Sequence, residues 1–258
     1  MAMAHKHAHR RVATTSRPGI SIVIPTLNEA ANVGPLFERI KAALTVLTMP
    51  YELIVVDDRS TDATTTVALQ NAKRLKLPVR VVQKEGRLGK SFSLIQGFGL
   101  ARYTILGMID GDLQFPPEAF PAMIAQLEHA QIVIGDRRAT YHETSLRGLL
   151  SQAYRTLFTK YLFGIDTDMQ SGIKVFYRTL YEAIDLEPGP WSFDIDLVSQ
   201  AALRGFTIAN VPITFSSRVA GTSKVQPLRV GAELALHALR VRLTHRRHAR
   251  VQQPAEMT

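Results

Sequence analysis

Apolar residues recur along the chain at two spacings. Short runs of β-branched and aliphatic residues predict buried strands, whereas apolar residues three and four positions apart predict amphipathic helices. The runs predict strands at 20–24, 52–56, 79–82, 103–109 and 131–134. The spaced positions predict helices over about 33–47, 62–75, 91–101 and 117–127. Because strands and helices alternate and the strands are apolar throughout, the sequence predicts an α/β domain with a mostly parallel sheet and helices on both faces.

After residue 134 the strict alternation ends. Apolar positions between Leu146 and Tyr161 predict a long amphipathic helix, and a basic helix is predicted from about Pro227. The segments between them predict a strand at 174–177, a helix over about 193–204 and a strand at 206–211. No low-complexity linker interrupts these elements, so we expect a single domain.

The domain limits follow from this pattern. We expect a disordered basic arm over residues 1–18, one catalytic domain over 19–226, and a basic amphipathic helix and tail over 227–258.

Composition narrows the chemistry. The 258 residues include no cysteine, so a metal site would need oxygen or imidazole ligands. Apolar stretches fall well short of the roughly 18 residues of a membrane span, and residues 1–19 contain no apolar signal core, which predicts a cytoplasmic protein.

The positive charge lies mainly at the two ends of the chain. The net charge is +9, and the segment from Lys224 to Arg250 contains seven Lys or Arg residues and a single acid, Glu233. This excess favours an anionic partner. His5, His7 and His9 in the arm could bind adventitious metal, although a solvated arm is the favoured interpretation.

Polar residues gather where four consecutive predicted strands end. They are Asn28 and Glu29, Asp57 and Asp58, the segment from Lys84 to Lys90, and Asp110, Asp112 and Gln114. Any one of them could cap a helix or face solvent. Ligands of open α/β sheets bind beyond the carboxyl ends of the strands, so together these residues predict a binding site there.

Asp110 and Asp112 predict a site for Mg²⁺ or Mn²⁺. Carboxylate oxygens suit hard divalent cations, which usually bind through one or two carboxylates plus substrate phosphates. Gln114 can add a neutral oxygen or orient a carboxylate. Since no hydrolytic triad is evident, a diphosphate leaving group neutralised by the cation is the favoured chemistry.

Several motifs carry a resemblance to a known family. They are "SIVIPTLNEAANV", "ELIVVDDRSTDAT", "GRLGKSFSLIQGF", "MIDGDLQFPPE", "IGDRR", "DMQSGIKVFYR" and "FSSRVAGTSK". Over about Ile20 to Lys224 the chain resembles inverting nucleotide-sugar glycosyltransferases of the GT-A fold, in the branch of the dolichyl- or polyprenyl-phosphate mannose synthases. The first two motifs occur across many glycosyltransferases, and "DGDLQFPPE" and "SSRVAGTSK" are more specific to transfer onto a lipid phosphate.

The resemblance implies roles for individual residues. The implied nucleotide contacts are Pro25, Asn28, Glu29, Asp57 and Asp58, with Lys90 and Asp110 beside them. The implied metal site consists of Asp110, Asp112 and Gln114. The implied catalytic residues are Asp112, Arg137, Arg218 and Lys224, where Arg137 is favoured over Arg138 for the acceptor phosphate or the sugar diphosphate. The implied substrate contacts are Arg138, Asp168 and Ser171.

The implied acceptor removes the need for a strong base. A lipid phosphate monoester has a second pKa of about 6, so its oxygen is largely anionic near neutral pH. Asp194 or Asp196 could supply a base if the acceptor were a sugar hydroxyl. Positions two apart on a helix diverge, so at most one of them faces the site; Asp196 is kept as a candidate substrate contact, with a structural role as the alternative.

The leading hypothesis is transfer of a hexose, with mannose favoured, from GDP-mannose or UDP-glucose to polyprenyl phosphate. The alternatives are a glycosyltransferase acting on a sugar hydroxyl and a catalytically silent nucleotide-sugar-binding protein. A nucleic-acid-binding module is disfavoured because acids gather at the expected site and no stacking motif accompanies the arginines.

The basic C-terminal helix leaves two interpretations open. Val230, Leu234, Ala238 and Val241 share one face of it. That face could lie on an anionic bilayer, making the protein peripheral on the inner face of the membrane, or it could pack on the domain.

Overall fold

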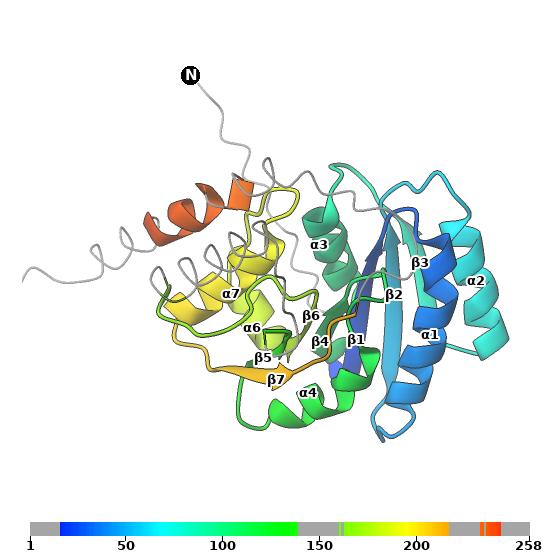
Figure 1. Ribbon diagram of the computed structural model, residues 1–258, viewed down its shortest axis with the longest axis horizontal. Helices are drawn as coiled ribbons and strands as arrows, with labels where there is room; N and C mark the ends of the chain where they lie inside the picture. The colour runs from blue at the N-terminus through cyan, green and yellow to red at the C-terminus, as the bar shows by residue number, and fades with distance from the viewer. Residues whose placement is uncertain (1–15, 139–159, 161–162, 217–232, 235, 244–258) are drawn as a thin grey trace, which may run out of the picture.

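The computed structural model describes residues 16–138, 160, 163–216, 233, 234 and 236–243. Within them, seven strands form one sheet in the order β3-β2-β1-β4-β6-β5-β7 (Figure 1). The strands are β1 (Arg17–Thr26), β2 (Tyr51–Asp57), β3 (Val79–Gln83), β4 (Tyr103–Ile109), β5 (Ile132–Asp136), β6 (Ile173–Tyr177) and β7 (Ile208–Pro212). Every neighbouring pair is parallel except those of β6, which runs antiparallel to β4 and β5.

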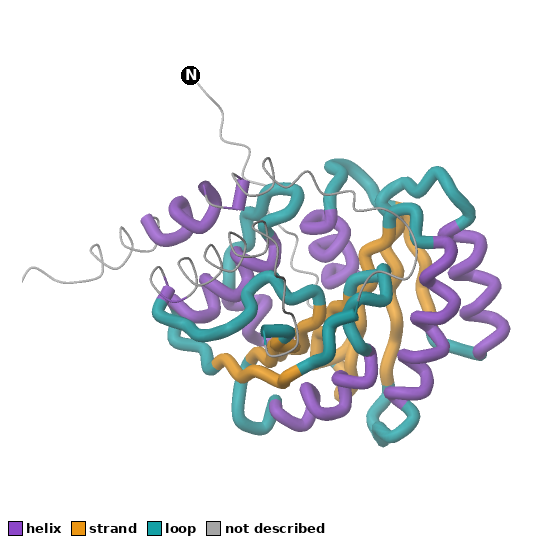
Figure 2. Tube along the Cα trace, in the orientation of Figure 1, coloured by secondary structure: helices purple, strands orange, loops and turns teal. Residues whose placement is uncertain are grey.

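Helices cover both faces of the sheet (Figure 2). One face carries α1 (Ala30–Leu44), α2 (Thr64–Leu75) and α4 (Phe120–Gln126). The other carries α3 (Lys90–Leu100), α6 (Arg178–Ala183) and α7 (Phe193–Leu203). The strand positions alternate between the two layers, so that Ile22 of β1 belongs to one core and Val23 to the other, both fully buried. Each aliphatic side chain buried in this way contributes about 1.5–3 kcal/mol.

The strand order places the expected site. β1 lies between β2 and β4, and the chain continues outward from β1 in opposite directions on its two sides. At such a switch point the loops after the neighbouring strands diverge and leave a crevice at their carboxyl ends. The loops after β1 and β4 therefore border the crevice.

The predicted strands and the first helices are confirmed, with shifts of one to a few residues at their ends. The helix predicted over 117–127 is divided into a 3-10 turn, Pro117–Ala119, and α4. Pro121 lacks the N–H that would bond to the carbonyl of Pro117, and the N–H of Phe120 bonds to that carbonyl instead. The six-residue helix α6 was not predicted, because it is too short to show a periodicity.

Two predicted helices fall wholly or partly outside the described residues. The long amphipathic helix predicted over about 146–161 lies outside them almost entirely. Of the C-terminal helix, residues 233, 234 and 236–243 are described, and they are helical. No helix in the described part of the chain is long and apolar enough to cross a membrane.

Gly97 allows α3 to approach the sheet closely. A Cβ at this position would collide with Val23 Cγ1 and lie 3.2 Å from Val56 Cγ2. Two residues further along the same helix, Gly99 has no atom within 4 Å of the equivalent position.

We predict that Gly97→Ala destabilises the protein by about 1–3 kcal/mol, because the added methyl group overpacks the contact between α3 and β1. Gly99→Ala is the matched control and should raise stability by up to about 1 kcal/mol through helix propensity. Urea unfolding followed by circular dichroism measures both. Equal stabilities of the two variants would contradict the close packing at Gly97.

Candidate active site

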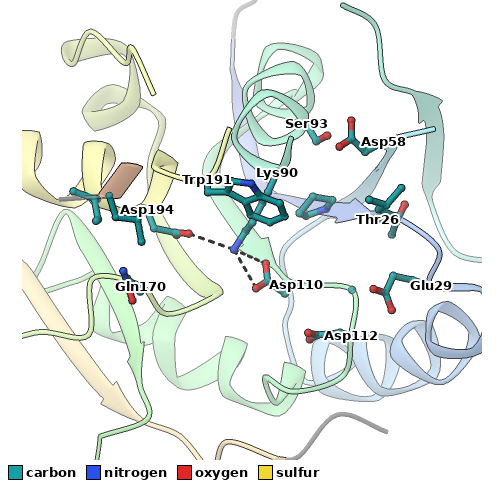
Figure 3. Close-up of a pocket in the computed structure, with 15 residues that line it drawn as sticks. Thr26, Glu29, Asp58, Lys90, Ser93, Asp110, Asp112, Gln170, Trp191 and Asp194 are labelled. Atoms are coloured by element: carbon teal, nitrogen blue, oxygen red, sulfur yellow. Dashed lines mark hydrogen bonds and ion pairs between the residues drawn. The ribbon is translucent and has the colours of Figure 1, made fainter. Parts of the chain in front are cut away.

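A pocket of about 240 Å³ opens at the carboxyl ends of the central strands (Figure 3). The loops after β1, β2 and β4, the start of α3 and the segment before α7 form its walls. The predicted site residues that line it are Pro25, Glu29, Asp58, Lys90, Asp110 and Asp112. The strand ends thus meet at one pocket, as the sequence pattern predicted.

Left-handed backbone shapes three of these loops. Asn28, Arg59 and Leu113 have φ angles of 52°, 63° and 63°. Non-glycine residues adopt such angles rarely, and they persist where surrounding contacts hold them. Each lies within four residues of the end of β1, β2 or β4. These turns redirect the chain immediately beside the pocket.

Asn28 and Asp57 connect the loops after β1 and β2. The backbone N–H of Asn28 donates to Ser60 Oγ at 2.8 Å, and Asn28 Oδ1 accepts from the N–H of Thr61 at 2.7 Å. The Asp57 carboxylate accepts from the backbone and the hydroxyl of Ser60 at 2.9 and 2.5 Å. Both residues were expected to contact the nucleotide, but neither lines the pocket. Asn28 thus bonds across the two loops, whereas Asp57 holds Ser60 within its own loop and accepts from Thr26 Oγ1, at the end of β1, at 3.3 Å.

Asp58 lines the pocket. Its Oδ2 accepts from the N–H of Gly89 at 2.8 Å. Its Oδ1 is buried, and among the described residues it has no hydrogen-bond partner. The hydroxyl of Ser93, which also lines the pocket, is buried in the same way. Buried polar atoms are rarely unpaired, so both atoms are suited to bind a ligand.

Gly89 fixes the start of α3 and therefore the position of Lys90. It has a φ of 124°, and a Cβ there would lie 2.7 Å from Pro190 Cβ. The N–H of Ser91, the second residue of α3, donates to the Pro190 carbonyl at 3.0 Å. The loop before α7 thus packs directly on the first turn of α3.

Four charged side chains, three of which line the pocket, form a chain in which acids and lysines alternate. Lys90 Nζ lies 2.7 Å from Asp110 Oδ1 and 3.3 Å from Asp194 Oδ2 (Figure 3). Asp194 Oδ1 lies 2.5 Å from Nζ of Lys174, whose side chain is fully buried. Lys174 also donates to the Ser171 carbonyl. The two acids and two lysines neutralise one another within a part of the molecule that water reaches poorly.

The chain shifts the pKa values of its members. Burial opposes the charge on Lys90, but its ion pairs with Asp110 and Asp194 outweigh this and raise the pKa of Lys90 above its ordinary value. Burial likewise opposes the charge on Asp194, yet the two ammonium groups lower the pKa of Asp194 overall. For Lys174, burial dominates over the attraction of Asp194 and lowers the pKa of Lys174. Asp194 is therefore an ionised carboxylate with weak basicity.

Asp194, rather than Asp196, lines the pocket. The Asp196 carboxylate points elsewhere, where it accepts from the backbone N–H of Glu187 and from Gln200 Nε2, both at 2.8 Å. The expected substrate contact by Asp196 is therefore not supported by its position. The sequence did contain a signal that favours Asp194 over Asp196. Lys174 lies inside an otherwise apolar strand, and a buried ammonium needs a nearby carboxylate, which Asp194 supplies.

Asp110 and Asp112 face the pocket on either side of Gly111. Among the described residues no three His, Cys, Asp or Glu side chains are grouped so that they could hold a metal ion. Gln114, the third expected ligand, does not line the pocket, and its Nε2 is 3.4 Å from the Ser216 carbonyl. The structure therefore offers two carboxylates at this position.

The two arginines of "GDRR" are paired with acids outside the pocket lining. Arg137 Nε lies 2.7 Å from Asp168 Oδ2, and its guanidinium carbon lies 5.2 Å from the ring centre of Phe215. Arg138 pairs with Asp136 at 2.6 Å and also with Asp166. Asp168 is thus the partner of Arg137.

The remaining predicted residues are either buried or not described. Ser171 is fully buried, and its carbonyl accepts from Lys174. Arg218 and Lys224 lie outside the described residues.

Gln170, Trp191 and Leu234 are among the pocket residues that were not predicted. Trp191 is held by its backbone N–H, which donates to Glu233 Oε1 at 2.9 Å. Figure 3 shows Asp194 and Gln170 at the opposite end of the pocket from Asp58 and Thr26, with Lys90 and Asp110 between them. Leu234 and Glu233 come from the C-terminal helix, so that helix completes a wall of the pocket.

Curated relatives include several transferases that act on prenyl phosphates. The chain is 29% identical over 210 residues to the dodecaprenyl-phosphate galacturonate synthase of Rhizobium johnstonii, covering 80% of this chain and 61% of that protein. It is 30% identical over 218 residues to the dolichol-phosphate mannosyltransferase of Pyrococcus furiosus, covering 80% and 59%. For the polyprenol monophosphomannose synthase of Mycolicibacterium smegmatis the identity is 29%, covering 79% and 80%. The chain thus spans about three fifths of the length of the first two.

The fold matches that of a solved synthase. The glucosyl-3-phosphoglycerate synthase of Mycobacterium tuberculosis, in complex with Mn²⁺, UDP and glucosyl-3-phosphoglycerate, aligns with a TM-score of 0.68 at 23% identity. The alignment covers 87% of this chain and 80% of that one. This similarity shows a shared fold and confirms the predicted GT-A arrangement.

The sequence model of one family, described as "Glycosyl transferase family 2", matches residues 21–185. That stretch contains the second half of β1, every element from α1 to α6, and every acid that lines the pocket except Asp194. The chain therefore belongs to glycosyl transferase family 2.

Proposed function

We propose that the protein transfers a hexose from a nucleotide sugar to polyprenyl phosphate with inversion at the anomeric carbon. The observation that carries the proposal is the convergence of Asp58, Asp110 and Asp112 from the ends of two strands, β2 and β4, on one pocket, where Asp58 Oδ1 is buried and unpaired among the described residues. The curated relatives support the acceptor class, since their names specify dodecaprenyl, dolichol and polyprenol phosphates.

The pocket suggests a direction for the donor. The nucleoside would lie at the end formed by Asp58 and Ser93, whose unpaired oxygens can bind a base or ribose. The diphosphate would lie at Asp110 and Asp112, and the sugar would lie toward Asp194, Gln170 and Trp191. GDP-mannose is our first choice, because two of the relatives are named for mannose transfer, and UDP-glucose is the alternative.

Mg²⁺ or Mn²⁺ fits the carboxylate pair. Asp110 and Asp112 both present carboxylates to the pocket, and Gly172 leaves room for Asp110, since a Cβ on Gly172 would collide with Asp110 Oδ2. These two acids would hold the ion, with Gln114 behind them. When bound, the ion would neutralise the negative charge that develops on the departing diphosphate.

The ionic partners of Asp194 favour a phosphate acceptor over a sugar hydroxyl. A hydroxyl acceptor needs a general base with a pKa near neutrality. Asp194 is the carboxylate at the sugar end of the pocket, and its lysine partners lower its pKa instead. An acceptor phosphate is already anionic and needs no such base. Asp194 is suited to hold Lys90 and to accept hydrogen bonds from sugar hydroxyls.

The acceptor phosphate would be bound by cationic side chains. Arg218 and Lys224, which lie outside the described residues, are our candidates for this contact, together with Arg137, which pairs with Asp168. Because a polyprenyl phosphate stays in a bilayer, we propose that the protein works as a peripheral protein at the membrane surface.

We predict that Asp112→Asn abolishes transfer and greatly weakens metal-dependent donor binding, while the fold is retained. The change removes a negative ligand without changing the size of the side chain. Turnover of radiolabelled GDP-mannose and of UDP-glucose with polyprenyl phosphate, and Mn²⁺ titrations with the nucleotide, measure the effect. Asp185→Asn, at a carboxylate that is 94% exposed, is the control and should behave as wild type. Wild-type turnover by Asp112→Asn would sink the metal assignment.

We predict that Asp58→Asn weakens nucleotide binding roughly 10- to 100-fold even without metal, because a hydrogen bond to a charged group contributes about 1.5–3 kcal/mol. The asparagine can still accept from the N–H of Gly89, so the loop should keep its conformation. Calorimetry with GDP and UDP in the presence of a chelator measures the loss. Unchanged affinity would leave Asp58 with only its loop contact.

A further inference from the structure

The C-terminal helix carries a second apolar face that points into solvent. Leu236, Leu239 and Leu243 are 69%, 48% and 51% exposed. Their spacings of three and four residues place them along one side of the helix. Six large hydrophobic side chains are exposed in the described part of the chain, and half of them belong to this segment of eight residues.

The opposite face of the helix is packed on the domain. Leu234 and Ala238 are buried in the core that includes α7, and Val241 packs against it. His237 Nε2 lies 3.3 Å from Asp196 Oδ1, and Glu233 accepts from the N–H of Trp191. The apolar face expected from the sequence is therefore covered by the domain. The three exposed leucines are a separate surface.

Cations accompany the leucines. Arg240 is 69% exposed and pairs with the exposed Glu187 at 3.3 Å, and Arg242 is partly exposed. The sequence adds Arg246, Arg247 and Arg250 immediately after this segment. Apolar side chains next to arginines match a bilayer surface with anionic headgroups, because the leucines enter the acyl boundary while the arginines meet the phosphates.

We propose that the face formed by Leu236, Leu239 and Leu243 docks on an anionic bilayer surface. This inference rests on the proposed function and identifies the surface that would deliver the pocket to its acceptor. Leu234, on the inner side of the same helix, lines the pocket, and Glu233 holds Trp191 of the pocket wall. Docking of the outer face therefore places one wall of the pocket directly beside the membrane.

The test compares two matched pairs of exposed side chains. The test variant, Leu236→Gln/Leu239→Gln, replaces two leucines that are 69% and 48% exposed. The control variant, Val46→Gln/Leu69→Gln, replaces Val46 just after α1, which is 72% exposed, and Leu69 on α2, which is 54% exposed. Neither pair lines the pocket, so both variants should keep the wild-type melting temperature and nucleotide affinity. Binding is measured by co-sedimentation with phosphatidylglycerol/phosphatidylcholine vesicles and with pure phosphatidylcholine vesicles, each at low and high salt.

We expect Leu236→Gln/Leu239→Gln to bind the anionic vesicles at least about tenfold more weakly, because two leucines that would be buried in the bilayer are lost. The control pair should bind as wild type. Salt should release the wild type, since exposed arginines are screened. Transfer to a long-chain acceptor in vesicles should fall in step with binding, and transfer to a short, water-soluble prenyl phosphate should not change.

Several outcomes would overturn the docking surface. One is unchanged vesicle binding by Leu236→Gln/Leu239→Gln, and another is an equal loss in the control pair. A third is a wild-type dimer in light scattering that the leucine variant dissociates without any change in vesicle binding, which would assign the face to a second copy of the chain. Absence of transfer to either acceptor by the wild type would instead refute the proposed function, and the vesicle measurements would still decide on the surface.

Discussion

The ion pair between Lys174 and Asp194, with the pairs that continue from it to Lys90 and Asp110, fixes the elements around the pocket. Lys174 lies in β6, between apolar neighbours and with no exposed surface, so its ammonium needs a carboxylate inside the protein. Asp194 supplies it and thereby ties the first turn of α7 to the sheet. The same carboxylate reaches Lys90 at the start of α3, and Lys90 reaches Asp110 at the end of β4. Removal of one partner from a buried pair typically costs about 3–5 kcal/mol, so these four elements are held in one arrangement.

This arrangement also determines which chemistry the pocket supports. Asp110 and Asp112 place two negative charges one residue apart beside the position proposed for a diphosphate, and Lys90 offsets part of that repulsion. At the opposite end of the pocket, Asp194 is held by two ammonium groups, which lower its pKa and make it a weaker base. A site built in this way favours a nucleophile that is already anionic. The electrostatics of the pocket and the phosphate acceptors named for the curated relatives therefore support the same proposal.

The sequence predicted the sheet and the pocket edge because both depend on local patterns. Asp58, Asp110 and Asp112 follow apolar strands directly, and parallel strands bring their carboxyl ends together. Asn28 and Asp57 have the same position in the pattern but bond to Ser60 and Thr61. For Asn28, spacing cannot separate a ligand contact from a loop-to-loop contact, because its partners lie about thirty residues away and are fixed only by tertiary structure. The same limit applies to Asp194 and Asp196, whose environments differ although they are two residues apart.

The C-terminal helix shows how tertiary packing decides between two apolar faces. Periodicity identified Leu234, Ala238 and Val241 as one face, and the structure buries it. Ala238 is fully buried on this face, whereas Leu236, Leu239 and Leu243 remain exposed on the other side of the helix. Because Leu234 lines the pocket and Glu233 holds Trp191, a segment more than a hundred residues after β4 completes the wall of a site founded on β1 and β4. The pocket wall is therefore complete only when the C-terminal helix packs on the domain, so the two faces of that helix contact the pocket on one side and solvent on the other.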